Sequence, residues 1–194
     1  MSSDVLSQPD PLLRSFLWKL FGRRLFSMSY HNWYGFRRRI LRAFGAQISA
    51  TTDFRPTVAL DRPWNLRCGE HVLVGDYALI LARCPITIGD RAVVSQRTSL
   101  LTEARDHTRP GAAPIHKPIT IGPDAWVATD ALVLPGVSLG AGAVIGARSM
   151  VDADVPDWTI AAGDPARPLK KREFRPHESV TSSATGGNSS PPAS

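Results

Sequence analysis

Aliphatic residues recur at every sixth position over much of the second half of the chain. The repeat is unbroken at Ile121, Val127, Val133, Leu139, Ile145 and Val151. A helix favours a period of 3.6 residues and a half-buried strand a period of 2, whereas self-similarity at a longer fixed period is typical of a solenoid. We therefore expect a coil of short strands in which one aliphatic side chain per repeat points to the axis.

The same period continues upstream, with interruptions. Three further groups of inward positions are Ile88, Val94 and Leu100; Cys68, Val74 and Ile80; and Ile48, Phe54 and Leu60. Because three repeats make one triangular coil, we predict an all-β solenoid of about five coils over residues 46–160. Leu100 and Ile121 are separated by 21 positions instead of six. A long excursion in a compact repeat is usually functional, so the loop 101–120 is the first candidate for chemistry.

The segment 11–45 differs in charge and pattern from the solenoid. Residues 11–44 contain eight basic and no acidic residues. The hydrophobic pattern predicts a short helix after residue 11 and a second helix with Trp33, Phe36, Ile40 and Phe44 on one face. Two interpretations are open: a helical cap on the open end of the solenoid with solvated arginines, or a basic amphipathic segment on an anionic inner membrane. No base-reading motif supports nucleic-acid binding.

The remaining composition indicates one globular domain. Hydrophobic residues make up 43% and charged residues 21% of the 194 positions. No signal-peptide pattern and no apolar run of membrane-spanning length is visible, so we expect a cytoplasmic protein. Cys68 occupies an inward position and is expected to be a buried free thiol. Polar composition predicts disorder in 1–10 and 176–194. Residues 161–175 form a C-terminal extension, in which 169–172 are expected to open a short helix.

The tandem repeats, followed by the sequence Ala-Gly-Asp-Pro-Ala at 162–166, resemble the hexapeptide-repeat acyltransferases. The blocks 62–66, 88–96 and 117–128 resemble more narrowly the colanic-acid-type sugar O-acetyltransferases. This resemblance implies a left-handed parallel β-helix, a homotrimer, and acetyl-CoA as co-substrate without a metal. It also implies transfer of acetyl to a hydroxyl of a sugar, a lipid-linked sugar or another exopolysaccharide precursor.

The resemblance assigns the catalytic histidine of the family to the loop 101–120. At the matching position this chain has Arg105, which cannot act as a base near neutral pH. Asp106 matches the family's aspartate, and His107 follows it. We expect His107, oriented by Asp106, to be the general base, with Arg105 and Arg97 binding the substrate. The alternative is a catalytically silent binding or scaffold protein that keeps the fold.

The resemblance also places the co-substrate. Thr129 and Ala147, one coil apart, are expected to line the groove for the CoA arm. Trp126 either covers that arm or packs between subunits. Arg167 and Lys170 match positions near the CoA 3′-phosphate, where cationic donors are suited. Asp152 and Ala153 stand where many relatives carry Thr-Lys, so one phosphate contact is expected to be missing.

A γ-class carbonic anhydrase would share the solenoid but needs three zinc-binding histidines at coil-compatible spacing. His71, His107 and His116 do not have that spacing. His71 and His116 are also weak candidates for the general base. We therefore expect an acyltransferase rather than a metal-dependent hydratase.

Overall fold

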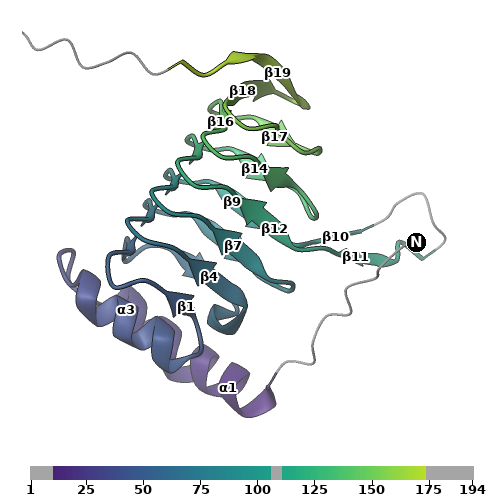
Figure 1. The fold of residues 1–194 in the computed structure, drawn as a ribbon. Helices are drawn as coiled ribbons and strands as arrows, with labels where there is room; N and C mark the ends of the chain where they lie inside the picture. The colour runs from purple at the N-terminus through teal and green to yellow at the C-terminus, as the bar shows by residue number, and fades with distance from the viewer. Residues whose placement is uncertain (1–10, 106–110, 174–194) are drawn as a thin grey trace, which may run out of the picture.

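The computed structural model describes residues 11–105 and 111–173, which form a parallel β-solenoid on a helical base (Figure 1). The terminal segments expected to be disordered, 1–10 and 176–194, lie outside the described residues, whereas residues 161–173 of the C-terminal extension are described. The proposed catalytic pair Asp106 and His107 also lies outside them. No described helix is long and apolar enough to cross a membrane.

Each turn of the solenoid contributes one short strand to each of three faces. Face A contains β1 (Gln47–Ile48), β4 (Leu66–Cys68), β7 (Ile86–Ile88), β12 (Ile119–Ile121) and β15 (Ser138–Leu139). Face B contains β2 (Asp53–Phe54), β5 (Leu73–Val74), β8 (Val93–Val94), β13 (Trp126–Val127), β16 (Val144–Ile145), β18 (Thr159–Gly163) and β19 (Ala166–Lys171). Face C contains β3 (Ala59–Leu60), β6 (Leu79–Leu81), β9 (Ser99–Leu101), β14 (Leu132–Val133) and β17 (Met150–Val151). Five described strands on faces A and C agree with the expected number of coils.

The six-residue repeat marks the axis of the solenoid. Ile88 pairs in register with Ile121 on face A, and Val94 pairs with Val127 on face B. All four side chains are buried, as expected for positions stacked in one apolar column. Cys68 is also buried and is a free thiol, whose pKa is raised by its burial. The predicted solenoid and its inward positions are therefore confirmed.

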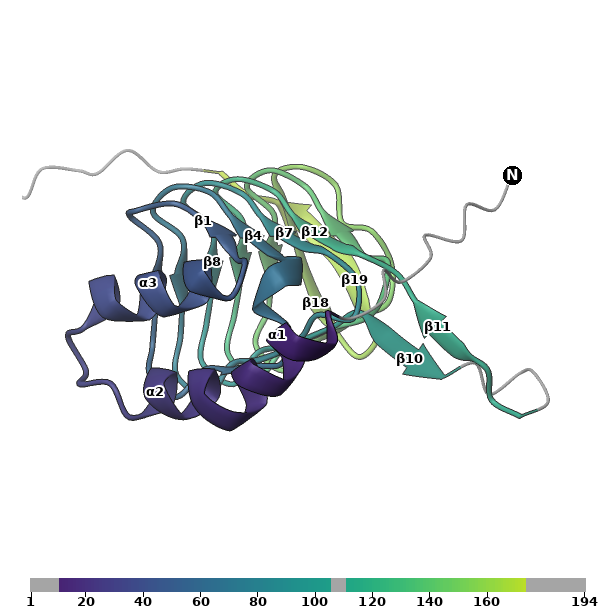
Figure 2. The same cartoon turned by 90° about the horizontal axis from the view of Figure 1, so that it is seen from below.

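The N-terminal segment lies across the first turn of the solenoid (Figure 2). It consists of α1 (Leu12–Leu17), a π-helical turn η1 (Trp18–Gly22), α2 (Arg23–Ser27) and α3 (Tyr34–Ala43). Trp18 is buried, donates its indole N–H to the carbonyl of Leu60 at 3.0 Å, and packs edge-to-face on Phe44. The segment therefore caps the open end.

The inward face of α3 differs from the prediction. Trp33 and Phe36 are exposed, whereas Arg37 is fully buried beside Ile40. Arg38 pairs with Asp53 at 2.7 Å. The arginines of this helix are thus not all solvated, because several of them supply hydrogen bonds to backbone and side-chain groups at the first turn.

A short 3₁₀ turn η2 (Pro63–Asn65) occupies one of the longer joins between coils. The loop 101–120 contains two antiparallel strands, β10 (Glu103–Arg105) and β11 (Pro114–His116), which we call the hairpin arm. The arm projects from the side of the solenoid (Figure 1).

The prediction of a short helix at 169–172 is wrong. Leu169, Lys170 and Lys171 belong to strand β19, which pairs antiparallel with β18. The physical reason lies in the neighbour: β18 is the last parallel strand of face B, and its outer edge would otherwise have unpaired backbone groups. The basic run therefore continues the sheet.

Candidate active site

The root of the hairpin arm is attached to the preceding coil through Thr102. This side chain is buried, donates its hydroxyl to the carbonyl of Leu81 at 2.8 Å and accepts the backbone N–H of Cys84 at 3.0 Å. Beyond this point, β10 and β11 pair with each other in a separate two-stranded sheet. The direction of the arm is therefore determined by contacts close to its root.

Three charged or titratable side chains meet at that root. Glu103 lies directly opposite His116 in the hairpin, and Arg83 of the preceding coil donates to the Glu103 carboxylate at 3.0 Å. His116 Nε2 is 3.8 Å from the other carboxylate oxygen and is a buried nitrogen without a hydrogen-bond partner. The bond from Arg83 holds the pKa of Glu103 below its usual range. Glu103 is therefore an ionised carboxylate facing an imidazole.

Arg105 ends the first strand of the arm, where it is exposed and opposite Pro114. Because side chains alternate along a strand, Arg105 is on the same side of the hairpin as Glu103. The sequence did not single out Glu103, and it gave His116 only as a weak candidate for the general base. Their pairing depends on the register of the hairpin, which the spacing of residues in the sequence does not determine.

A second group of candidate residues stacks along the edge between faces B and C, which we call the B–C corner. The backbone N–H of Asp130 donates to the carbonyl of Gln96 at 3.1 Å, and that of Arg148 donates to the carbonyl of Thr129 at 2.9 Å. Thr129 therefore stands one coil above Gln96 and one coil below Ala147. The spacing used to place Thr129 and Ala147 is thus realised as a direct stack.

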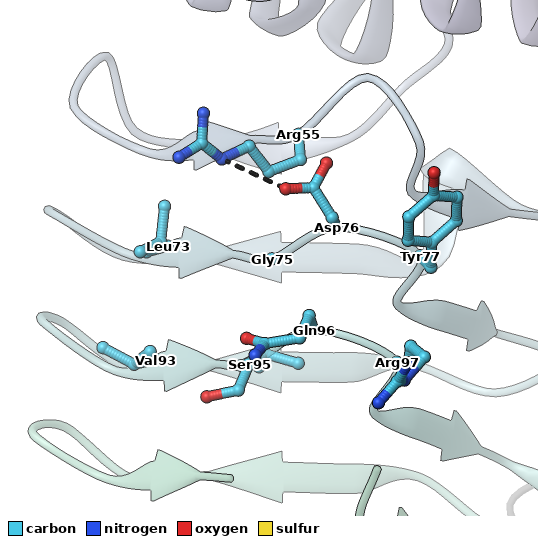
Figure 3. A pocket seen from close by; sticks show the side chains of 10 residues that line it. Arg55, Leu73, Gly75, Asp76, Tyr77, Val93, Ser95, Gln96 and Arg97 are labelled. Atoms are coloured by element: carbon cyan, nitrogen blue, oxygen red, sulfur yellow. Dashed lines mark ion pairs between the residues drawn. The ribbon is translucent and has the colours of Figure 1, made fainter. Parts of the chain in front are cut away.

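A groove of about 480 Å³ lies at the lower end of this corner (Figure 3). Its apolar part includes Leu73 and Val93, and its polar part is supplied by Arg55, Asp76, Tyr77, Gln96 and Arg97. The volume is within the range of small-molecule sites, which combine an apolar lining with a few polar groups.

The sequence alone pointed only to Arg97 among the groove residues. Asp76 and Gln96 were detectable in principle, because they are one coil of 20 residues apart. The side chain of Tyr77 is 67% exposed, which leaves an aromatic face available to a ligand. Arg97 is held by a two-bond contact to Asp130, at 2.7 and 3.0 Å.

Trp126 lies on face B beside this groove. Its backbone pairs with Val93, and its indole N–H donates to the hydroxyl of Ser95 at 2.9 Å. The ring is 46% exposed. Trp126 is therefore partly exposed beside the groove, where a ligand could contact it.

The candidate phosphate-binding residues are on the last strand. Arg167 forms an ion pair with Asp152 at 2.9 Å, which holds the pKa of Asp152 below its usual range. Lys170 is exposed on the same strand. An internal carboxylate therefore already occupies one side of the guanidinium that a phosphate would use.

The arm and the groove belong to different edges of the same solenoid. The arm leaves after strand β9 of face C and returns to β12 of face A, whereas the groove follows the corner between faces B and C. Figure 2 shows the arm extending away from the coil. One chain therefore brings Gln96, Thr129 and Ala147 together and leaves Arg105 on another edge. Among the described residues, no group of three His, Cys, Asp or Glu is arranged to hold a metal ion.

Comparison with known proteins gives a consistent result, although no family model matches the chain. WcaF of Escherichia coli K12, which its name assigns to colanic acid biosynthesis as an acetyltransferase, is 37% identical over 156 residues. The match covers 80% of this chain and 86% of WcaF.

Solved structures extend the likeness to the fold. The hexapeptide-repeat acetyltransferase VCA0836 of Vibrio cholerae has a TM-score of 0.73 and 29% identity, covering 84% of this chain and 92% of that one. The same protein was also solved with acetyl coenzyme A. A maltose O-acetyltransferase of Clostridium difficile 630 has the same TM-score and identity, over 85% of this chain and 90% of that one. With the repeat, the coil and these relatives in agreement, the chain belongs to the hexapeptide-repeat acetyltransferase family.

Proposed function

We propose that this protein transfers acetyl from acetyl-CoA to a hydroxyl of a sugar or exopolysaccharide precursor, including a lipid-linked sugar. The observation that carries the proposal is the groove at the B–C corner, which continues into the stack of Thr129 and Ala147. A carboxylate, an amide and an exposed aromatic ring are groups that bind hydroxyl-rich ligands. The names of the relatives support the same class of acceptor.

The co-substrate is proposed to lie along the same corner. The backbone of Thr129 and Ala147 lines the pantetheine arm, and Trp126 covers it. Arg167 and Lys170 contact the 3′-phosphate at the last strand. This arrangement leaves the thioester at the lower end of the corner, beside the groove that holds the acceptor.

The chemistry requires one proton transfer and one acyl transfer. His107, oriented by Asp106, takes the proton of the acceptor hydroxyl as its oxygen attacks the thioester carbonyl carbon. The carbon–sulfur bond then breaks, and the departing CoA sulfur receives the proton from the imidazolium. Arg105 and Arg97 bind and orient the acceptor, because a guanidinium donates hydrogen bonds but cannot accept this proton.

The assembly proposed for this reaction is a homotrimer, in which the arm of one subunit reaches the B–C corner of the next. A three-fold arrangement repeats one such contact at each interface. The placement of arm and groove on different edges of the solenoid supports it. We further propose a cytoplasmic protein that contacts the anionic inner membrane peripherally through residues 11–44.

The decisive experiment measures release of CoA thiol from acetyl-CoA with purified protein and a panel of sugars and sugar precursors. We expect thiol release that depends on the acceptor. His107→Ala should lower turnover by about 10²–10⁴-fold with little change in CoA affinity, because general-base catalysis is worth about that factor. Arg105→Ala should mainly weaken acceptor binding. Full activity of His107→Ala would show that another group is the base.

A catalytically silent binding protein is the second candidate, and Arg105 at the family's histidine position favours it. Such a protein would bind CoA in a titration but show no acceptor-dependent thiol release. Arg105→His offers the matched test. A strong rise in activity in this variant would identify the natural chain as one that has lost the family's base.

A further inference from the structure

The outer surface of the helical base is unusually apolar. Most of the large apolar side chains that the described structure leaves exposed lie between residues 12 and 36. We call this set the apolar base surface: Leu12, Leu13, Phe16, Leu17, Leu20, Phe21, Leu25, Met28, Tyr30, Trp33 and Phe36. Phe16 is 61% and Trp33 is 56% exposed. A concentration of exposed large apolar side chains on one helical segment indicates an interaction surface.

Capping the solenoid does not require this surface. The contacts with the first turn are made by the opposite side of the helices, where Trp18, Phe26, Ile40 and Leu41 are buried in the core. The helices therefore have two apolar faces, and only one of them packs on the coil. A surface helix that only caps would present polar residues outward.

The charge around the apolar base surface indicates what covers it. Of the eight basic residues between 11 and 44, six are exposed, namely Arg14, Lys19, Arg23, Arg24, Arg39 and Arg42. No acidic residue occurs in this range. A second copy of the same surface would bring like charges together, which is unfavourable. An anionic bilayer supplies both the apolar interior and the negative charge.

We propose that the apolar base surface docks on an anionic lipid bilayer, with Phe16, Phe21 and Trp33 at the headgroup level and the arginines on lipid phosphates. The inference rests on the proposed sugar acetyltransferase for its biological use, but not for its geometry. It assigns the membrane contact to the outer face of the helices, while the inner face caps the coil. The same helices then both cap the solenoid and contact the membrane, as the two interpretations of this segment require.

The apolar base surface is linked to the acceptor groove through the loop between α2 and α3. The loop between α2 and α3 carries exposed Tyr30 and His31, and the buried guanidinium of Arg37 holds it by donating to the carbonyls of both residues at 2.9 and 2.8 Å. Arg55, which lines the groove, contacts Nε2 of His31 at 2.6 Å and donates to the hydroxyl of Tyr34 at 2.7 Å. Arg55 therefore connects the groove to His31 and Tyr34, which follow Tyr30 and Trp33 of the apolar base surface in the sequence. An acceptor sugar carried on a lipid would meet the groove there.

The test is co-sedimentation of the full chain with vesicles of phosphatidylglycerol and phosphatidylcholine, compared with phosphatidylcholine alone. We expect binding to the anionic vesicles at low salt and release at high salt, because salt screens exposed charges. Arg23→Ala and Arg24→Ala should each lower the vesicle affinity about fivefold. Arg67→Ala removes an exposed arginine from face A, outside the apolar base surface, and should leave the affinity unchanged.

A second measurement locates the contact. Brominated lipids should quench the fluorescence of the wild-type protein, and Trp33→Phe should remove most of that quenching. Phe16→Ser with Phe21→Ser should abolish vesicle binding while the thermal melt shows an intact fold. Leu169→Ser, which changes an exposed apolar side chain on the last strand, is the matched control.

Absence of pelleting at low salt would overturn the proposal, as would equal binding to phosphatidylcholine alone. If Phe16→Ser with Phe21→Ser instead changes the oligomeric state in sedimentation velocity, the surface is an interface between copies and the proposal is wrong. Neither measurement involves acetyl transfer. A failed membrane contact is therefore distinguishable from a failed assignment of the reaction.

Discussion

At the residue scale, close approach between coils explains several small residues of the repeat. A Cβ atom added to Gly89 would lie 2.5 Å from the backbone nitrogen of Pro123 on the next coil. Several corners are turned by residues with side chains: Tyr77 and Arg97 have φ of 58° and 57°. At Gly89 the structure shows that the neighbouring backbone leaves no room for a side chain.

The contact between Arg167 and Asp152 leads to a prediction about CoA. Asp152→Asn should raise CoA affinity several-fold, because it removes the carboxylate that competes with the phosphate for Arg167. Arg167→Ala should lower the affinity for CoA. For both variants, the difference in CoA affinity from the wild type should become smaller at high salt. Isothermal titration with CoA measures all of these effects.

The pH dependence of the ion pair between Arg167 and Asp152 follows from the direction of the pKa shift of Asp152. Arg167 lowers the pKa of Asp152, so the ion pair is present at neutral pH and is lost only as the pH falls through the lowered pKa. The affinity difference between Asp152→Asn and the wild type should therefore persist across the neutral range. An Asp152→Asn protein with unchanged CoA affinity would show that Arg167 does not bind the phosphate.

At the element scale, Arg37 ties the α2–α3 loop and helix α3 to the first coil. Its guanidinium is fully buried and donates to the carbonyl of Phe54 at 2.7 Å and to the hydroxyl of Ser29 at 2.9 Å. Arg37→Met should lower the free energy of unfolding by about 3 kcal/mol, because buried acceptors lose a charged donor.

Arg39→Met on the same helix is the control, since Arg39 is exposed, and it should change the stability by less than about 0.5 kcal/mol. Chemical denaturation of both variants tests the comparison. Equal stabilities would mean that Arg37 is dispensable for the cap.

At the scale of the whole molecule, the separation of arm and groove predicts subunit complementation. Sedimentation should give a trimer at micromolar concentration. A subunit with an inactive arm, His107→Ala, and a subunit with an impaired groove, Asp76→Ala with Gln96→Ala, should each be nearly inactive alone. Mixed trimers of the two should recover activity, because some interfaces then combine an intact arm with an intact groove.

Mixing should be done after dissociation and reassembly, with each variant reassembled alone as the control. Thiol release from acetyl-CoA is the measurement. No recovery in verified mixed trimers would indicate that arm and groove act within one chain.

The sequence by itself determined the solenoid, its approximate number of coils and its inward positions. The reason is that the repeat is local: each short strand pairs with the strand one coil away, so the period, with the loop 101–120 left out, places Ile88 below Ile121 and Thr129 below Ala147. The sequence also showed that the loop 101–120 is the long excursion from the repeat. It showed as well that the basic segment 11–44 lies outside the repeats of the solenoid.

Only the tertiary structure decided how non-local groups meet. The sequence did not show that Glu103, His116 and Arg83 converge at the root of the arm, because their contact depends on hairpin register and on the preceding coil. Helical periodicity placed Trp33 and Phe36 on the inward face. In the structure Arg37 is buried on that face instead, because several carbonyl groups accept hydrogen bonds from its guanidinium. The sequence also predicted a helix at 169–172. In the structure most of these residues pair with the open edge of β18, because the cost of leaving backbone groups at that edge unpaired outweighs the local helix preference.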